Sequence, residues 1–258
     1  MSVVIATTAL ALQRPGTGAV DSAACAAEAC IGSSDVDKSA IDLLINIGVY
    51  KDENRIEPAT AAFIQKRIGL NTDPLRNNFD HTTFSFDLSN GPCSFLHAVQ
   101  TVNALSRTDA IRTALVVSSN ALSMGMATST QPYSGVAAAA LLTRTDDKNR
   151  GFRDLAFYTD DDGEPAIFGY CDPGEYGPGA AGHVTIDTDA KMSERLERFI
   201  VLKIKDYLNK NNIDPSEIFF LLPSYQRVGL VREIVEATGI QPGLPADKLE
   251  LNGGAHSS

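Results

Sequence analysis

Short apolar runs alternate with helix-forming segments along much of this chain, and this order restricts it to few fold classes. Residues 3–12 and 40–49 are largely apolar and partly β-branched, as buried strands are. Each run is followed by a segment of helical character, at residues 21–30 and 58–70. Strands that alternate with helices predict an α/β fold with a parallel sheet.

The same order continues along the rest of the chain. Residues 151–182 are rich in aromatic, acidic, Gly and Pro residues, which is typical of strands joined by an exposed loop. The further strands expected are residues 82–88, 114–119, 136–142, 218–222 and 248–251. The further helices expected are residues 93–106, 192–211 and 228–238.

A weak internal echo suggests two similar halves. Residues 36–41 lead through an apolar strand and a helix to Ile68-Gly69-Leu70, and residues 213–218 lead likewise to Thr238-Gly239-Ile240. Any strand that is followed by a helix can end in this way. A true repeat and a coincidence therefore both stay open.

The charge of the chain excludes some functions. It carries 22 Lys and Arg against 32 Asp and Glu, a formal net charge of −10. Nucleic-acid binding is disfavoured because it depends on clustered basic residues. Apolar stretches such as residues 136–142 are far shorter than the roughly 18 residues that span a bilayer. The N-terminus lacks the basic segment of a signal peptide, and a cytoplasmic location is expected.

Cys93 has the sequence context of a reactive thiol. Four cysteines in a chain of this length do not indicate a disulfide framework, so each thiol is judged singly. Cys93 stands between the turn Ser89-Asn90-Gly91-Pro92 and an expected helix. The positive end of a helix dipole favours the thiolate, which is the nucleophile in acyl transfer. A lone cysteine is also commonly a small buried hydrophobic residue, so both interpretations stay open.

Residues 85–96, Ser-Phe-Asp-Leu-Ser-Asn-Gly-Pro-Cys-Ser-Phe-Leu, resemble the nucleophile segment of ketoacyl-ACP synthase III-like members of the thiolase superfamily. Residues 41–70, residues 114–119 and Leu221-Leu222-Pro223 with Gln226 are similar to that family in the same order.

This resemblance implies a fold, an assembly and an activity. The fold is a thiolase-like five-layered α-β-α-β-α arrangement of two duplicated halves, here residues 1–150 and an incomplete C-terminal half, residues 151–258. The assembly is a homodimer, or a heterodimer with a homologous subunit. The activity is acyl transfer from CoA or acyl carrier protein through a cysteine, with no bound cofactor or metal.

Two positions depart from the family's pattern. Aligned without gaps on Asp87 and Phe95, the family's usual cysteine falls on Pro92. Cys93 lies one residue later, which corresponds to a rotation of about 100° on a helix. The family's catalytic histidine follows a strand and a proline, and the matching position in this chain is Ser224. The family's base is therefore absent from that position.

A substitute base must come from another histidine. His256 lies in the Gly-rich segment 252–258, which resembles the loop that carries the family's asparagine, with Ala255 at about the asparagine's place. His256 either replaces the missing base or is a terminal surface residue. His97 stands four residues beyond Cys93 on the expected helix, and it either contacts that residue or packs as an ordinary helix residue. His81 and His183 carry no specific signal.

Other candidate sites have weaker signals. Cys25 and Cys30 do not share a helix face well, so helix packing is expected over metal binding. The acidic residues 160–164 lack the spacing of a calcium loop. The residues that would suit CoA phosphates or an acidic carrier protein, or that simply form a solvated helix face, are Lys203, Lys205, Lys210, Arg227 and Arg232.

Two functions are therefore expected. The first is an acyltransferase or condensing enzyme of fatty-acid or polyketide-type biosynthesis, in which Cys93 takes an acyl group as a thioester and backbone N–H groups hold the oxyanion. The second is a catalytically degenerate subunit that pairs with an active homologue. The acyl chain, the donor and the pathway do not follow from the sequence.

Overall fold

The chain forms two compact units, which divide between Leu155 and Ala156. The computed structural model describes residues 2–14, 16–55, 57–73, 75, 81–121, 135–147, 149–160, 167–170, 185–188, 192–222 and 230–240. Each unit has a hydrophobic core of its own, so the two are described separately. The predicted strand at residues 248–251 lies outside the described residues.

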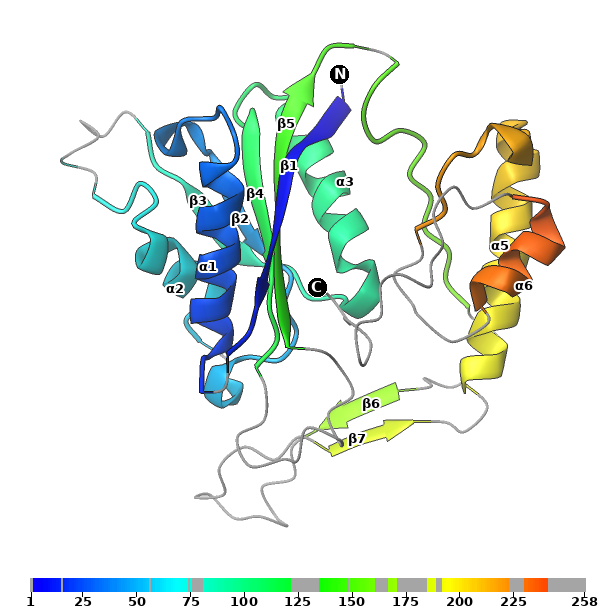
Figure 1. The fold of residues 1–258 in the computed structure, drawn as a ribbon, viewed down its shortest axis with the longest axis horizontal. Coiled ribbons are helices and arrows are strands. Elements are labelled where there is room, and N and C mark those ends of the chain that lie inside the picture. The colour runs from blue at the N-terminus through cyan, green and yellow to red at the C-terminus, as the bar shows by residue number, and fades with distance from the viewer. Residues whose placement is uncertain are drawn as a thin grey trace. The chain divides into compact units, whose positions relative to one another are not determined.

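A five-stranded sheet organises the first unit (Figure 1). In spatial order its strands are β1 (Ser2–Leu12), β5 (Val136–Thr145), β4 (Thr113–Ser118), β2 (Leu43–Asn46) and β3 (Phe84–Asp87). Strand β2 pairs in parallel with β3 and β4, which confirms the predicted parallel pairing. Strand β5 runs antiparallel to β4 and β1, so the sheet as a whole is mixed.

In the described part of this unit, α-helices cover both faces of the sheet. Helices α1 (Ala19–Gly32) and α2 (Thr60–Ile68) pack on one face, and α3 (Ser94–Ser106) packs on the other (Figure 1). Strand β4 is buried along its whole length, because its alternate side chains point to opposite faces and both are covered. Leu115 and Val117 meet α1 and α2, whereas Ala114 and Val116 meet α3.

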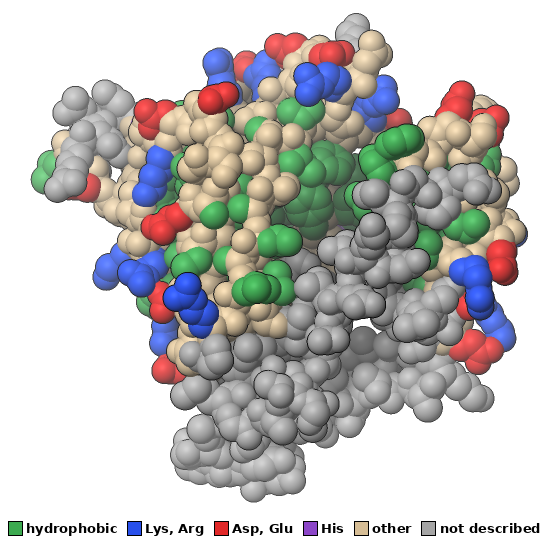
Figure 2. Space-filling view, viewed as in Figure 1, with side chains coloured by type: hydrophobic (Ala, Val, Ile, Leu, Met, Phe, Trp, Pro, Cys, Tyr) green, Lys and Arg blue, Asp and Glu red, His purple; other side chains and the backbone are tan. Residues whose placement is uncertain are grey.

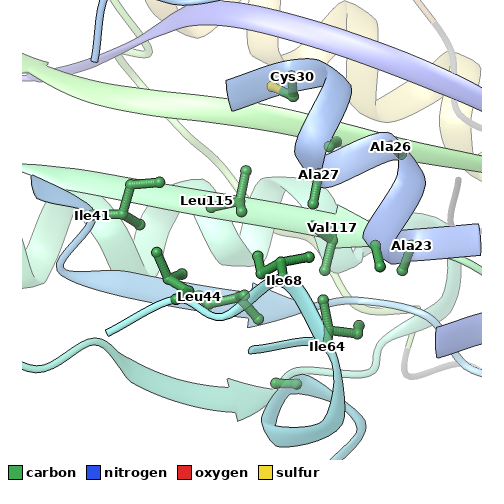
Figure 3. Packing of buried hydrophobic residues seen from close by; sticks show 14 of the residues in the cluster. Ala23, Ala26, Ala27, Cys30, Ile41, Leu44, Ile64, Ile68, Leu115 and Val117 are labelled. Carbon is green, nitrogen blue, oxygen red and sulfur yellow. The ribbon is translucent and has the colours of Figure 1, made fainter. Parts of the chain in front are cut away.

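Small residues allow α1 to lie close to the sheet. Ala23, Ala26, Ala27 and Cys30 on α1 are each 0% exposed and belong to the core that contains Leu115 (Figure 3). Burial raises the pKa of the Cys30 thiol, as expected for a cysteine that packs as a small hydrophobic residue.

The burial of strand β1 differs from the prediction. We expected a buried strand at residues 3–12, but β1 lies at the edge of the sheet, and exposed and half-buried residues alternate along most of it. Ile5, Leu10 and Leu12 are exposed, and Figure 2 shows hydrophobic side chains on the surface where β1 lies. The sequence suggested a buried strand because most residues on the exposed face of β1 are also apolar.

In its described residues, the second unit contains a strand pair and two α-helices. Strands β6 (Ile167–Tyr170) and β7 (Thr185–Thr188) pair antiparallel. Helix α5 (Met192–Asn211) has the bounds predicted from the sequence, and α6 is Leu230–Thr238. Leu208 from α5 packs with Leu230 and Ile234 from α6 in the core of this unit.

The strand predicted at residues 218–222 is not formed. This segment has no strand assignment, and Phe219, Phe220 and Leu222 are exposed, with exposed fractions of 72%, 45% and 79%. The reason is that an apolar run becomes a strand only where neighbouring strands supply hydrogen-bond partners. In the described part of this unit, the two strands are β6 and β7, and they pair with each other.

The turns that begin the two segments of the internal echo share one local structure. Asp37 and Asp214 each precede a 3-10 turn, and the side chain of each accepts a hydrogen bond from the main-chain N–H two residues later. After both turns the backbone takes the same direction, with φ −82° and ψ 110° at Ile41 and φ −83° and ψ 108° at Ile218. Two separate segments therefore follow one local pattern.

Within the described residues, no helix combines the length and the apolar character needed to cross a bilayer.

Candidate functional site

Cys93 lies where the sequence predicted it, at the start of a helix that follows a strand. Strand β3 ends at Asp87, a 3-10 turn spans Gly91–Cys93, and α3 begins at Ser94. The thiol-bearing residue is exposed. The carboxyl ends of parallel strands are where open α/β sheets bind their ligands, and Cys93 follows one of these ends.

Hydrogen bonds within the turn hold the backbone of Cys93. The N–H of Asn90 donates to the Ser94 hydroxyl at 2.6 Å, and the N–H of Cys93 donates to the carbonyl of Asn90 at 3.1 Å. Ser94 is fully buried. Gly91 has φ 50°, a backbone conformation that glycine adopts without strain. Pro92 supplies a fixed φ at the beginning of the helix.

The carboxylate of Asp87, at the end of β3, collects four hydrogen bonds. Its Oδ1 accepts from the Asn46 side chain at 3.1 Å and from the N–H of Ala61 at 2.8 Å. Its Oδ2 accepts from the Lys51 ammonium at 2.7 Å and from the N–H of Thr60 at 2.8 Å. Burial alone would raise the pKa of Asp87, but these four bonds outweigh it and hold the pKa below its ordinary value.

The loop after β2 is pressed against the end of β4. A Cβ atom on Gly48 would lie 2.1 Å from the main-chain oxygen of Ser119, so only glycine fits there. The side chain of Asn120 accepts hydrogen bonds from the N–H groups of Val49 and Tyr50, at 3.0 and 3.1 Å. Among the described residues, the buried hydroxyl of Ser119 has no hydrogen-bond partner.

His97 contacts Cys93 through the main chain. Its Nδ1 lies 3.0 Å from the carbonyl oxygen of Cys93 and 3.0 Å from the side-chain nitrogen of Asn90. The i,i+4 contact, one of the two alternatives that the sequence left open, is therefore present, but the hydrogen-bonding group is the carbonyl and not the thiol.

The structure leaves several predicted site residues without a test. Ser224, Ala255, His256, His183 and Arg227 lie outside the described residues. The roles predicted for Cys93, Ser224 and His256 stay predictions.

Other candidates have ordinary surroundings. Lys203 and Arg232 form ion pairs with Asp206 and Glu236 on their own helices. His81 lies 3.7 Å from Asp42. In the part of the chain that the structure describes, no cluster of His, Cys, Asp and Glu could hold a metal ion.

The Asp87 cluster was not found from the sequence, although a signal was present. Asp87 is the only Asp, Glu, Lys or Arg between His81 and Ser106, and it directly follows the apolar residues of β3. A charged residue in such a segment needs partners when it is buried. The partners could not be identified, because Lys51 stands 36 positions away in the sequence.

A family model matches the segment that contains this site. The model of 3-oxoacyl-[acyl-carrier-protein] synthase III matches residues 86–163. The β-ketoacyl-[acyl-carrier-protein] synthase III of Rickettsia rickettsii is 22% identical over 219 residues, which cover 83% of this chain. The chain spans 64% of the length of that relative, less than two thirds of it.

Solved structures share the fold. The priming β-ketosynthase of a polyketide biosynthetic pathway superposes with a TM-score of 0.75 at 13% identity, covering 99% of this chain and 84% of its own. OleA from Xanthomonas campestris, solved with lauric acid and lauroyl-CoA, has a TM-score of 0.67 at 17% identity, covering 94% of this chain and 83% of its own. The predicted thiolase-like α/β fold class is confirmed. The chain therefore resembles ketoacyl-ACP synthase III-like proteins in one segment of its sequence and in its fold.

Proposed function

We propose that this protein is an acyltransferase of the condensing-enzyme type, in fatty-acid or polyketide biosynthesis, and that Cys93 carries the acyl group. The observation that supports this most directly is the place of Cys93, exposed at the start of α3 and inside the segment that matches the synthase III model. An exposed thiol at that place is open to an acyl donor.

The proposed reaction is a thioester exchange. The sulfur of Cys93 attacks the carbonyl carbon of an acyl-CoA or an acyl carrier protein thioester, and a new carbon–sulfur bond forms. The carbon–sulfur bond to the donor then breaks. The proton of the Cys93 thiol passes to a base or to solvent and ends on the departing thiol. Main-chain N–H groups at the start of α3 are the proposed donors to the oxyanion.

Release of free CoA tests this proposal. The protein is mixed with acetyl-CoA or lauroyl-CoA and is then removed by ultrafiltration, and the free CoA in the filtrate is measured with a chromogenic disulfide. We expect one equivalent of CoA per chain from the wild type, and none from Cys93→Ala. Cys25→Ala is the matched control, because Cys25 is also an exposed cysteine, on α1, and its loss should leave release unchanged. Equal release from the wild type and Cys93→Ala would contradict the proposal.

The second candidate is a degenerate subunit that supports an active homologue. Two observations favour it. Pro92 occupies the position where the family's cysteine is expected. The imidazole of His97, the histidine one turn beyond Cys93, meets the carbonyl of Cys93. Under this hypothesis no donor releases CoA, and the protein raises the activity or stability of a homologous synthase that is co-purified with it.

A further inference from the structure

Asp87 links the segment of Cys93 to three other parts of the first unit. The carboxylate receives the first N–H groups of α2, the amide of Asn46 at the end of β2, and the ammonium of Lys51 in the following loop. Its side chain is 12% exposed. Charge-assisted hydrogen bonds to a largely buried carboxylate are among the stronger polar contacts in a protein.

The chain from Asp87 to Cys93 is short and is held along its length. The N–H of Leu88 donates to the carbonyl of Asn46 at 2.8 Å, and the hydroxyl of Ser89 lies 3.4 Å from the carbonyl of Gly48. The next bonds are those within the Asn90–Ser94 turn. Five residues, 88–92, therefore join Asp87 to Cys93, and hydrogen bonds hold the first three of them.

We propose that Asp87 is a positioning residue, which fixes the Cys93 segment against the ends of β2 and α2 so that the thiol meets the acyl donor in one orientation. This inference rests on the proposed function for its catalytic consequence. Its structural part, the ordering of residues 88–96, stands independently of that function.

Asp87→Asn tests the role of the Asp87 carboxylate, because asparagine has nearly the same shape as aspartate. An amide has one acceptor oxygen where the carboxylate has two, so two of the four donors lose their partner. Asp42→Asn is the matched control. Asp42 is 18% exposed and accepts the N–H groups of Arg112 and Thr113, but it lies at the opposite, amino ends of β2 and β4.

The first readout is acyl transfer from lauroyl-CoA. We expect Asp87→Asn to lower the maximal rate constant for acylation of Cys93 by about 10- to 100-fold, because small errors in orientation are costly, with the half-saturating concentration of lauroyl-CoA changed by less than about threefold. Asp42→Asn should keep this rate constant within about twofold of wild type. Lys51→Met should lower it by a smaller factor, and Lys51→Arg, which keeps a positive charge beside Asp87, should lower it less than Lys51→Met does.

The second readout is hydrogen–deuterium exchange of the peptide that contains residues 88–96. Asp87→Asn should speed its exchange, whereas Asp42→Asn should not. This measurement needs no acyl donor, so it tests the inference even where no CoA is released and the proposed function fails. Lys51→Met serves for both readouts if Asp87→Asn does not fold. The inference is overturned if Asp87→Asn and Lys51→Met match wild type in both readouts, or if Asp42→Asn has the same effects.

Discussion

The Nδ1 atom of His97 lies 3.0 Å from the main-chain oxygen of Cys93, one helical turn before it. The side-chain nitrogen of Asn90 lies at the same distance from that atom. One tautomer of the imidazole donates to the carbonyl, and the other accepts from the amide. In both cases the ring steadies the first turn of α3, which is a structural role.

His97→Ala should therefore leave acyl transfer largely intact. We expect the rate of CoA release to stay within about threefold of wild type, and the free energy of unfolding to fall by less than about 1 kcal/mol, because a neutral, exposed hydrogen bond is lost. His256→Ala should slow release at neutral pH if His256 is the base. A loss in His97→Ala as complete as in Cys93→Ala would instead make His97 the proton acceptor.

Asp87 should contribute to stability in a pH-dependent way. Its pKa is lower in the folded chain than in the unfolded one, so its contribution is complete above about pH 4 and is lost as the pH falls through the folded pKa. The difference in unfolding free energy between wild type and Asp87→Asn should shrink steadily as the pH falls from 5 towards 2, as judged by urea titrations. A difference that is constant over this range would show that the charge contributes nothing.

Gly48→Ala should be strongly destabilising, because the added Cβ would meet the oxygen of Ser119 at 2.1 Å. Since that neighbour is backbone, the strands must shift, and we expect a loss of about 1–3 kcal/mol or more. Gly32→Ala is the comparison, since a Cβ on Gly32 has no atom within 4 Å. Removing glycine from the last turn of α1 should stabilise by up to about 1 kcal/mol. Similar melting temperatures for the two variants would contradict the close contact between Gly48 and the main-chain oxygen of Ser119.

Two buried serines should respond in opposite ways. The Ser119 hydroxyl has no hydrogen-bond partner in the described part of the chain, so Ser119→Ala should be neutral or stabilising. The Ser94 hydroxyl accepts from Asn90, so Ser94→Ala should cost about 1–3 kcal/mol and should also disturb the turn before Cys93. Urea unfolding of both variants checks the pair. A large loss of stability in Ser119→Ala would show that its hydroxyl has a partner in solution.

The sequence was a good guide where the signal is local. The bounds of α5 followed from its helical pattern, and the short, largely apolar β2 followed from its composition. The place of Cys93 followed from the Gly-Pro turn before it. These features depend on residues that are close together in the chain, so periodicity, composition and turn residues are sufficient to predict them.

Features that depend on distant residues could not be predicted in the same way. Residues 218–222 are as apolar as β2, yet they form no strand, because pairing depends on neighbours that the segment itself does not encode. The Lys51–Asp87 ion pair joins residues that lie on either side of α2. Such contacts follow from the topology of the sheet, which periodicity does not specify.

Peptide mass mapping after incubation with lauroyl-CoA shows directly whether Cys93 carries an acyl group. The protein is digested under acidic conditions that preserve thioesters, and the peptide that contains Cys93 is compared between wild type, Cys93→Ala and Cys25→Ala. We predict a lauroyl adduct on Cys93 in wild type and Cys25→Ala, and no adduct in Cys93→Ala. An unmodified Cys93 with every donor tried, in a protein whose Cys93 reacts with iodoacetamide only after denaturation, would contradict acyl transfer through this thiol.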